Sequence, residues 1–137
     1  MDEHEQGTIL ILEDDADGAG LLHAWFNAQG YEVMVARKGE EALEMARANP
    51  PDVAVLDIML PGMDGFEVFK QMREHEKTRH TAVIFLTIRD EREEVLKGLE
   101  LGAIDYVTKP YDLQKLGLRV RNLVRYARGR MTQAGGA

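Results

Sequence analysis

Short apolar segments recur along the chain and alternate with longer amphipathic ones. The short segments are partly β-branched and show no polar alternation, which is typical of strands covered on both faces of a parallel sheet. The predicted strands span residues 8–12, 31–36, 53–57, 82–86 and 104–107. In the longer segments apolar residues return every three or four positions, as on one face of a helix. The predicted helices span residues 17–29, 39–48, 66–74, 91–101 and from about 112 to 128.

Turn-forming residues separate these elements. Gly30 and Gly102 follow two of the predicted helices, and Pro50 and Pro51 end another. Strict alternation of strand and helix predicts an α/β fold with five parallel strands and five helices on both faces of the sheet. We expect one domain over residues 8–128, with loose ends at residues 1–7 and 129–137.

Polar side chains stand where four of the predicted strands end. The carboxyl ends of parallel strands share one edge of an open α/β sheet, and ligands bind there. We therefore expect these side chains to meet. They are Glu13, Asp14, Asp57, Thr87 and Lys109.

These residue types indicate phosphate chemistry. Three carboxylates at one edge would repel each other unless a cation lies among them. Hard oxygen ligands favour Mg²⁺, which keeps several waters and bridges phosphate oxygens. Lys109 adds a positive charge and Thr87 a hydroxyl donor. With Asp57 as the nucleophile, these groups are the parts needed to form an acyl phosphate by in-line transfer.

Each residue also has an ordinary structural interpretation when it is taken alone. The acidic run 13–15 is placed to cap the helix that follows, and Asp15 can do so while Asp14 binds a metal. Asp57 stands shortly before a Pro-Gly turn and is a candidate turn residue. The joint placement at one sheet edge is what favours phosphate chemistry.

Composition narrows the class of protein. The 137 residues are 45% hydrophobic and carry a formal net charge of −7, which is an ordinary balance for one globular domain. The acidic balance argues against binding of nucleic acid or membrane by the whole surface. The absence of cysteine excludes disulfides and thiolate zinc sites. No apolar run approaches the ~18 residues of a membrane span, so we expect a cytoplasmic protein.

The sequence resembles the receiver domain of bacterial two-component response regulators. Four segments carry the resemblance: ILILEDD at 9–15, LDIMLPGMDG at 56–65, LT at 86–87 and GAIDYVTKP at 102–110. The resemblance implies the flavodoxin-like strand order 2-1-3-4-5. It also implies that Asp57 takes phosphate from a histidine kinase or phosphotransfer protein, without turnover of an external substrate.

The resemblance further implies a role for each site residue. Asp14, Asp57 and the backbone carbonyl of Met59 would ligate Mg²⁺, or Mn²⁺ in its place, and Glu13 would hold a metal-bound water.

Three further roles follow from the same resemblance. Thr87 and Lys109 would bind the phosphoryl oxygens. Tyr106 would be the aromatic residue that switches position together with Thr87. The Lys109–Pro110 peptide bond is expected to be cis.

The expected output surface comprises the helix over 91–101, the strand over 104–107 and the last helix. A downstream protein, a fused output domain or a second copy would bind it after phosphorylation, and we expect no direct contact with nucleic acid. Asp105 and Arg119 match one acid–arginine pair of receivers that dimerise there, whereas Ile104 replaces a frequent acid. A stripe of arginines on the last helix is either a solvated face or a contact for the acidic run 90–94; its members are Arg121, Arg125 and Arg128.

One position departs from the family pattern. The residue after Thr87 is usually small, and here it is Ile88. A larger apolar group beside the phosphate site should restrict the access of water or of a phosphodonor. We therefore expect slow autodephosphorylation.

Three other functions compete with the receiver interpretation. An aspartate-nucleophile phosphatase would typically carry a second aspartate two residues after the nucleophile, where this chain has Met59. A flavodoxin-like cofactor binder would need a phosphate loop where the acidic run 13–15 stands. A pseudo-receiver that serves only as a binding module would not need the complete set of Asp14, Asp57, Thr87 and Lys109.

Overall fold

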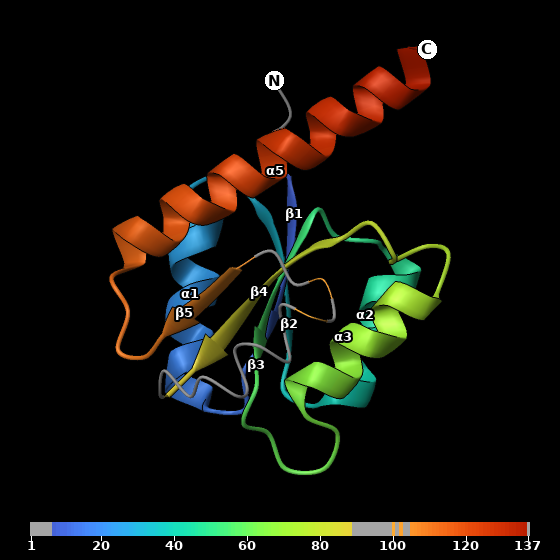
Figure 1. Cartoon of the computed structure of the whole chain (residues 1–137). Coiled ribbons are helices and arrows are strands. Elements are labelled where there is room, and N and C mark those ends of the chain that lie inside the picture. Colours follow the sequence, from blue (N-terminus) through green and yellow to red (C-terminus); the bar gives the residue numbers. More distant parts are fainter. Residues whose placement is uncertain (1–6, 89–99, 101, 103–104, 137) are drawn as a thin grey trace.

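Five parallel strands form a single sheet (Figure 1). The computed structural model describes residues 7–88, 100, 102 and 105–136. The strands are β1 (Thr8–Leu12), β2 (Glu32–Ala36), β3 (Val53–Asp57), β4 (Ala82–Thr87) and β5 (Asp105–Thr108). Their order is β2-β1-β3-β4-β5, so the predicted flavodoxin-like order is confirmed.

The described residues contain four helices, one fewer than predicted. They are α1 (Ala16–Ala28), α2 (Gly39–Ala48), α3 (Gly65–Glu74) and α5 (Leu113–Gly136). The predicted helix over 91–101 lies outside the described residues, apart from Glu100. Helices α1 and α5 pack on one face of the sheet and α2 and α3 on the other.

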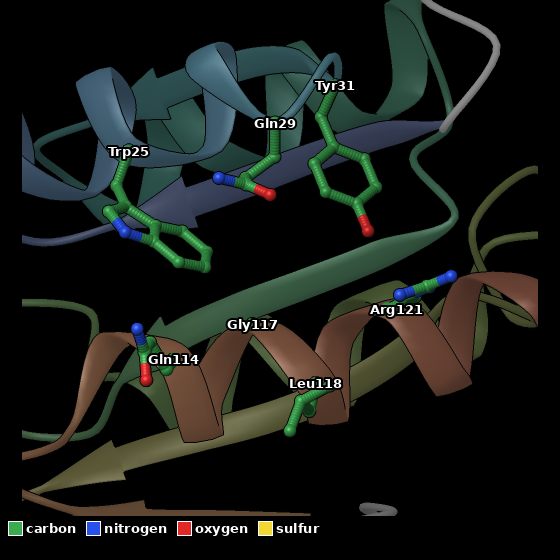
Figure 2. A pocket seen from close by; sticks show the side chains of 7 residues that line it. All are labelled: Trp25, Gln29, Tyr31, Gln114, Gly117, Leu118 and Arg121. Carbon is green, nitrogen blue, oxygen red and sulfur yellow. The ribbon is translucent and has the colours of Figure 1, made fainter.

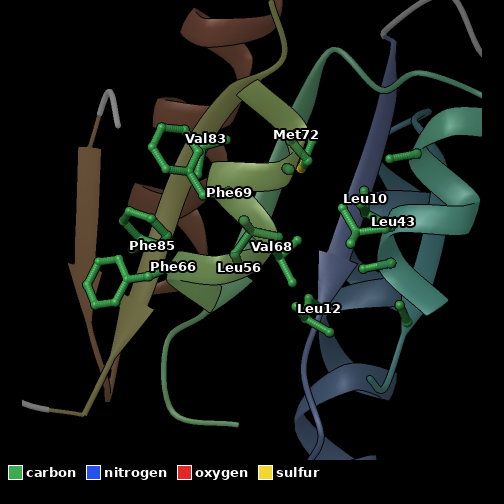
Figure 3. Packing of buried hydrophobic residues seen from close by; sticks show 14 of the residues in the cluster. Leu10, Leu12, Leu43, Leu56, Phe66, Val68, Phe69, Met72, Val83 and Phe85 are labelled. Carbon is green, nitrogen blue, oxygen red and sulfur yellow. The ribbon is translucent and has the colours of Figure 1, made fainter. Parts of the chain in front are cut away.

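The central strands are buried on both faces, as their unbroken apolar runs predict. In β1, Leu10 and Leu12 point into the cluster with α2 and α3, while Ile9 and Ile11 point into the cluster with α1 and α5. Figure 3 shows the first cluster, where aromatic rings of α3 pack edge-on against Phe85 of β4. Each such fully buried side chain contributes about 1.5–3 kcal/mol relative to exposure. The strands therefore form a rigid support for whatever stands at their ends.

Two aspartates cap α1 and α3, which begin near the carboxyl edge of the sheet. Asp15 Oδ2 accepts the Gly18 N–H at 2.8 Å at the start of α1. Asp64 Oδ1 accepts the Glu67 N–H at 3.0 Å at the start of α3. The capping interpretation of the acidic run 13–15 is thus confirmed for Asp15, and the other two acids remain available for different roles.

Both ends of the expected domain differ from the prediction. Helix α5 continues to Gly136, although we predicted a loose tail from residue 129. One glycine inside a helix costs only about 1 kcal/mol, and no proline follows Gly129 to end the helix. At the other end, Gly7 is buried and its carbonyl accepts the Glu32 N–H at 2.9 Å, so it belongs to the sheet edge.

The predicted acid–arginine pair lies within the chain. Arg119 Nη1 is 2.7 Å from Asp105 Oδ2 and also donates to the Tyr106 carbonyl at 3.1 Å. Residues 90–94, the suggested partners of the arginine stripe, lie outside the described residues. Within the described part of the chain, no helix has the length and apolar character needed to cross a membrane.

Candidate functional site

Four strands deliver polar side chains to one edge of the sheet, as predicted. The register places Leu12 beside Leu56, so the residues that follow them, Glu13 and Asp57, come together at the end of β1 and β3. Glu13 is 2% exposed and Asp57 3% exposed. Thr87, at the end of β4, is 2% exposed. Burial of charged acids is costly unless they are paired, so these carboxylates need a positively charged partner.

Lys109 is that partner. Its ammonium Nζ lies 2.7 Å from Glu13 Oε2 and 2.7 Å from Asp57 Oδ2. Its own backbone N–H donates to the Thr87 carbonyl at 2.6 Å. The Lys109–Pro110 peptide bond is cis, as the family resemblance implied.

The charge state of Lys109 follows from these contacts. Burial by itself lowers the pKa of the ammonium, but hydrogen bonds and charges from Asp57 and Glu13 outweigh it. The pKa of Lys109 is therefore raised above its ordinary 10.5. The lysine stays protonated throughout the neutral range and offers a fixed positive charge beside Asp57.

The three carboxylates form a group able to hold a cation. Oxygens of Glu13, Asp14 and Asp57 lie within 4.8 Å of one another, with Asp14 exposed and the other two buried. Backbone donors hold the remaining oxygens: the Met59 N–H donates to Asp57 Oδ1 at 2.9 Å, and the Asp15 N–H to Glu13 Oε1 at 3.2 Å. Three hard anionic ligands with one exposed side suit a divalent cation that keeps water ligands.

The loop after β3 is held close to Asp57 by a glycine. A β-carbon on Gly65 would lie 3.0 Å from the Asp57 carbonyl carbon, a spacing that real side chains rarely tolerate. The start of α3 therefore approaches the phosphoacceptor position only because residue 65 lacks a side chain.

Two apolar side chains near this edge face solvent. Met59 is 55% exposed and Ile88 58% exposed. Tyr106, the predicted switch aromatic, is half-buried on β5 and packs against the cluster formed with α2 and α3. The role of Ile88 in access, that of Tyr106 in the switch and that of the Met59 carbonyl in metal binding stay predictions.

Sequence reasoning missed two residues beside the site. Arg37, in the loop after β2, donates from Nε at 3.1 Å and from Nη2 to the Asp14 carbonyl. Tyr111 is half-buried, and its pKa is raised by burial and by the charges of Glu13 and Asp57, against an opposing effect of Lys109. The position of Tyr111 two residues after Lys109 was an available signal, whereas no local pattern links Arg37 to Asp14.

Comparison with known proteins agrees with this geometry. The family model described as "Response regulator receiver domain" matches residues 9–121. The response regulator PleD of Caulobacter vibrioides is 43% identical over 118 residues, which are 86% of this chain and 26% of that protein. The alkaline phosphatase synthesis transcriptional regulatory protein PhoP of Bacillus subtilis is 41% identical over 85% of this chain and 48% of that protein.

Solved structures show the same fold. A response regulator from Chloroflexus aurantiacus superposes with a TM-score of 0.81 at 38% identity, covering 87% of this chain and 98% of that one. The chemotaxis protein CheY4 of Vibrio cholerae gives a TM-score of 0.81 at 28% identity, over 85% and 97% of the two chains. The chain thus matches nearly all of these solved chains, whereas it spans a quarter to about half of the curated relatives PleD and PhoP.

Proposed function

This chain belongs to the response regulator receiver domain family, and from that premise we propose that Asp57 accepts a phosphoryl group from a histidine kinase or a phosphotransfer protein. The observation that carries the proposal is the convergence on Asp57 of a lysine ammonium and two further carboxylates. Asp57 Oδ2 faces Lys109, and Oδ1 is held by a backbone N–H. The nucleophile is therefore oriented before any donor arrives.

The transfer itself needs little covalent chemistry from the protein. An Asp57 oxygen attacks phosphorus in line, an O–P bond forms, and the bond from phosphorus to the donor's histidine nitrogen breaks. Lys109 then neutralises part of the phosphoryl charge, while the Thr87 hydroxyl donates to a phosphoryl oxygen. Both groups are held in place by the backbone hydrogen bond between them.

The acidic group fits Mg²⁺, or Mn²⁺ in its place. Asp14, Asp57 and the Met59 carbonyl would ligate the ion directly, and Glu13 would hold one of its waters. When bound, the ion neutralises charge on the phosphoryl oxygens. Lys109 is the one cation among the described residues that pairs with both Glu13 and Asp57, and a second positive charge would relieve the remaining repulsion among the acids.

Phosphorylation would change the local charge and shape. A carboxylate becomes a phosphoryl group with greater negative charge and three acceptor oxygens. Thr87 would move toward it, and Tyr106 would turn into the space that Thr87 leaves. The surface around β5 and α5 would then favour a downstream protein, a fused output domain or a second copy, as a shift between two populated states.

The site does not favour a phosphatase that acts on external substrates. Such an enzyme needs an acid or base beside the aspartyl phosphate, and the side chain at that position is Met59. The intact group of Asp14, Asp57, Thr87 and Lys109 likewise favours a phosphoacceptor over a receiver that only binds proteins. Any activity of a longer protein containing this chain would reside in its other domains.

The phosphoacceptor assignment can be tested with acetyl phosphate and Mg²⁺. We expect mass spectrometry of the intact protein to show one added phosphoryl group in the native chain and none in Asp57→Asn. The matched control is Asp64→Asn, which changes an aspartate of the same loop that caps α3 and lies outside the acidic group. Phosphoryl incorporation that persisted in Asp57→Asn would refute the site.

A further inference from the structure

A groove lies between α1 and α5, on the face of the sheet that carries these two helices (Figure 2). It has a volume of about 510 Å³, which is within the usual range for small-molecule sites. Its walls combine one aromatic side, one cationic side and two amides. The lining residues are Trp25, Gln29, Tyr31, Gln114, Gly117, Leu118 and Arg121.

The aromatic wall is rigid. Trp25 packs edge-on against Phe26 at 5.2 Å between ring centroids, and Phe26 packs in the same way against Tyr31 at 5.8 Å. The indole also lies directly against the backbone of α5, because a β-carbon on Gly117 would come within 2.6 Å of Trp25 Cζ3. The flat surface of the groove is thus set by packing before any ligand binds.

Tyr31 adds a hydroxyl group to the aromatic wall of the groove. The residue is only 4% exposed, and its hydroxyl points toward α5 (Figure 2). No described residue is a hydrogen-bond partner of that hydroxyl. Among the described residues, the Tyr31 oxygen is not a buried polar atom that lacks a partner, so the hydroxyl opens to the groove and is available to a molecule bound there.

The far wall is cationic. Arg121 lines the groove, and the charges of Arg121 and Arg125 both act on Tyr31, where they oppose the rise in pKa that burial causes. Neither arginine has an ion pair among the described residues. Gln29 and Gln114 add amide groups on the two sides.

We propose that this groove is a binding site for a small aromatic molecule that carries a carboxylate. The ring would lie against Trp25, the carboxylate would pair with Arg121, and a carboxylate oxygen would accept a hydrogen bond from the Tyr31 hydroxyl. An arginine fork matches the planar carboxylate geometry. The site is separate from Asp57 and does not depend on phosphoryl transfer.

The test uses the position of Trp25, which is the only tryptophan in the chain. Its indole N–H gives one resonance in an NMR spectrum, and this resonance reports on the groove directly. The probes are biphenyl-4-carboxylate and its neutral amide, which share the same rings and differ in charge. We expect a saturable shift of the indole resonance with the carboxylate, at an affinity at least fivefold tighter than with the amide.

Three variants locate the interaction. Arg121→Gln should abolish the preference for the carboxylate, and Tyr31→Phe should weaken carboxylate binding about two- to tenfold, as expected for one hydrogen bond. The control is Arg119→Gln, which changes an arginine of the same helix that pairs with Asp105 and does not line the groove. It should bind both probes as the native chain does.

Four outcomes would overturn the proposal. The first three are the absence of a saturable shift at millimolar probe, equal affinity for both probes, and equal loss of carboxylate binding in Arg121→Gln and Arg119→Gln. The fourth is a shift of the indole resonance with protein concentration alone, which would show that a second copy covers the groove. Phosphorylation of each variant with acetyl phosphate shows that it is folded and keeps this test independent of the one at Asp57.

Discussion

Acidic residues lie in different surroundings at the edge where the strands begin (the amino edge) and at the edge where they end (the carboxyl edge). At the amino edge, Asp52 Oδ2 accepts the Thr8 N–H at 2.9 Å and faces the exposed Arg128 at 3.5 Å. The backbone N–H of Asp52 in turn donates to the Thr8 carbonyl at 2.9 Å. At the carboxyl edge, Glu13 and Asp57 are almost completely buried and share one lysine.

This difference separates a structural acid from a group suited to chemistry. Asp52 has its own backbone donor and joins β1 to β3, so its charge is used within the fold. At the carboxyl edge, three acids and one lysine leave a local charge of about −2 (three negative, one positive). Crowded like charges store unfavourable energy that a bound cation relieves.

The largest expected effect is on divalent-cation binding. Asp14→Asn should weaken Mn²⁺ binding about a hundredfold, near 2.7 kcal/mol, because it removes one charged oxygen ligand. Asp52→Asn should leave binding unchanged, since it changes an acid at the opposite edge. Electron paramagnetic resonance of free Mn²⁺ measures both affinities. Equal affinities in the two variants would place the cation elsewhere.

For the free energy of unfolding, we expect the larger effect at the amino edge instead of the carboxyl edge. Asp52→Ala should lower the free energy of unfolding by about 1–2 kcal/mol, because the Thr8 N–H loses its acceptor. Asp57→Asn should leave it unchanged or raise it without metal, because one of three crowded charges disappears. Urea unfolding monitored by circular dichroism compares them. A loss in Asp57→Asn as large as that in Asp52→Ala would show that both edges are structural.

A smaller effect is expected on the rate of dephosphorylation, which depends on the access of water to the carboxyl edge. Ile88→Ala should speed loss of the phosphoryl group two- to fivefold, about 0.4–1 kcal/mol in barrier height, because water reaches the site more easily. The control is Leu21→Ala, which removes an exposed apolar side chain of α1. Dephosphorylation is followed by intact mass after removal of acetyl phosphate. A lifetime of seconds that Ile88→Ala does not change would contradict the proposed role.

The smallest effect is expected for the ion pair at the amino edge. Arg128→Ala should change the free energy of unfolding by less than about 0.5 kcal/mol, because the pair is long and the arginine is 49% exposed. Urea unfolding at low and at high salt measures it. A salt-sensitive loss above 1 kcal/mol would mean that Arg128 is as important to Asp52 as the Thr8 N–H.

Much of the site was predictable because its residues stand at the ends of apolar runs. The pattern around Asp57 located β3, and the same reasoning placed Thr87 and Lys109 at one edge. The contact of Arg37 with Asp14 was not predictable, because it depends on how the loop after β2 returns to the loop after β1. The length of α5 was also missed, since glycine at 129 suggested an end that one residue alone does not impose.

Sequence patterns were enough to locate the strands and the edge at which polar residues gather, and the motifs were enough to indicate the family. These depend on local periodicity and on the order of elements, which a linear pattern records. The pairing of Lys109 with both Glu13 and Asp57, and that of Asp105 with Arg119 within the chain, could be seen only in the folded structure. The folded structure also decided that Trp25 and Arg121 face one groove. Such pairings join residues far apart in the chain, and their partners are set by packing geometry.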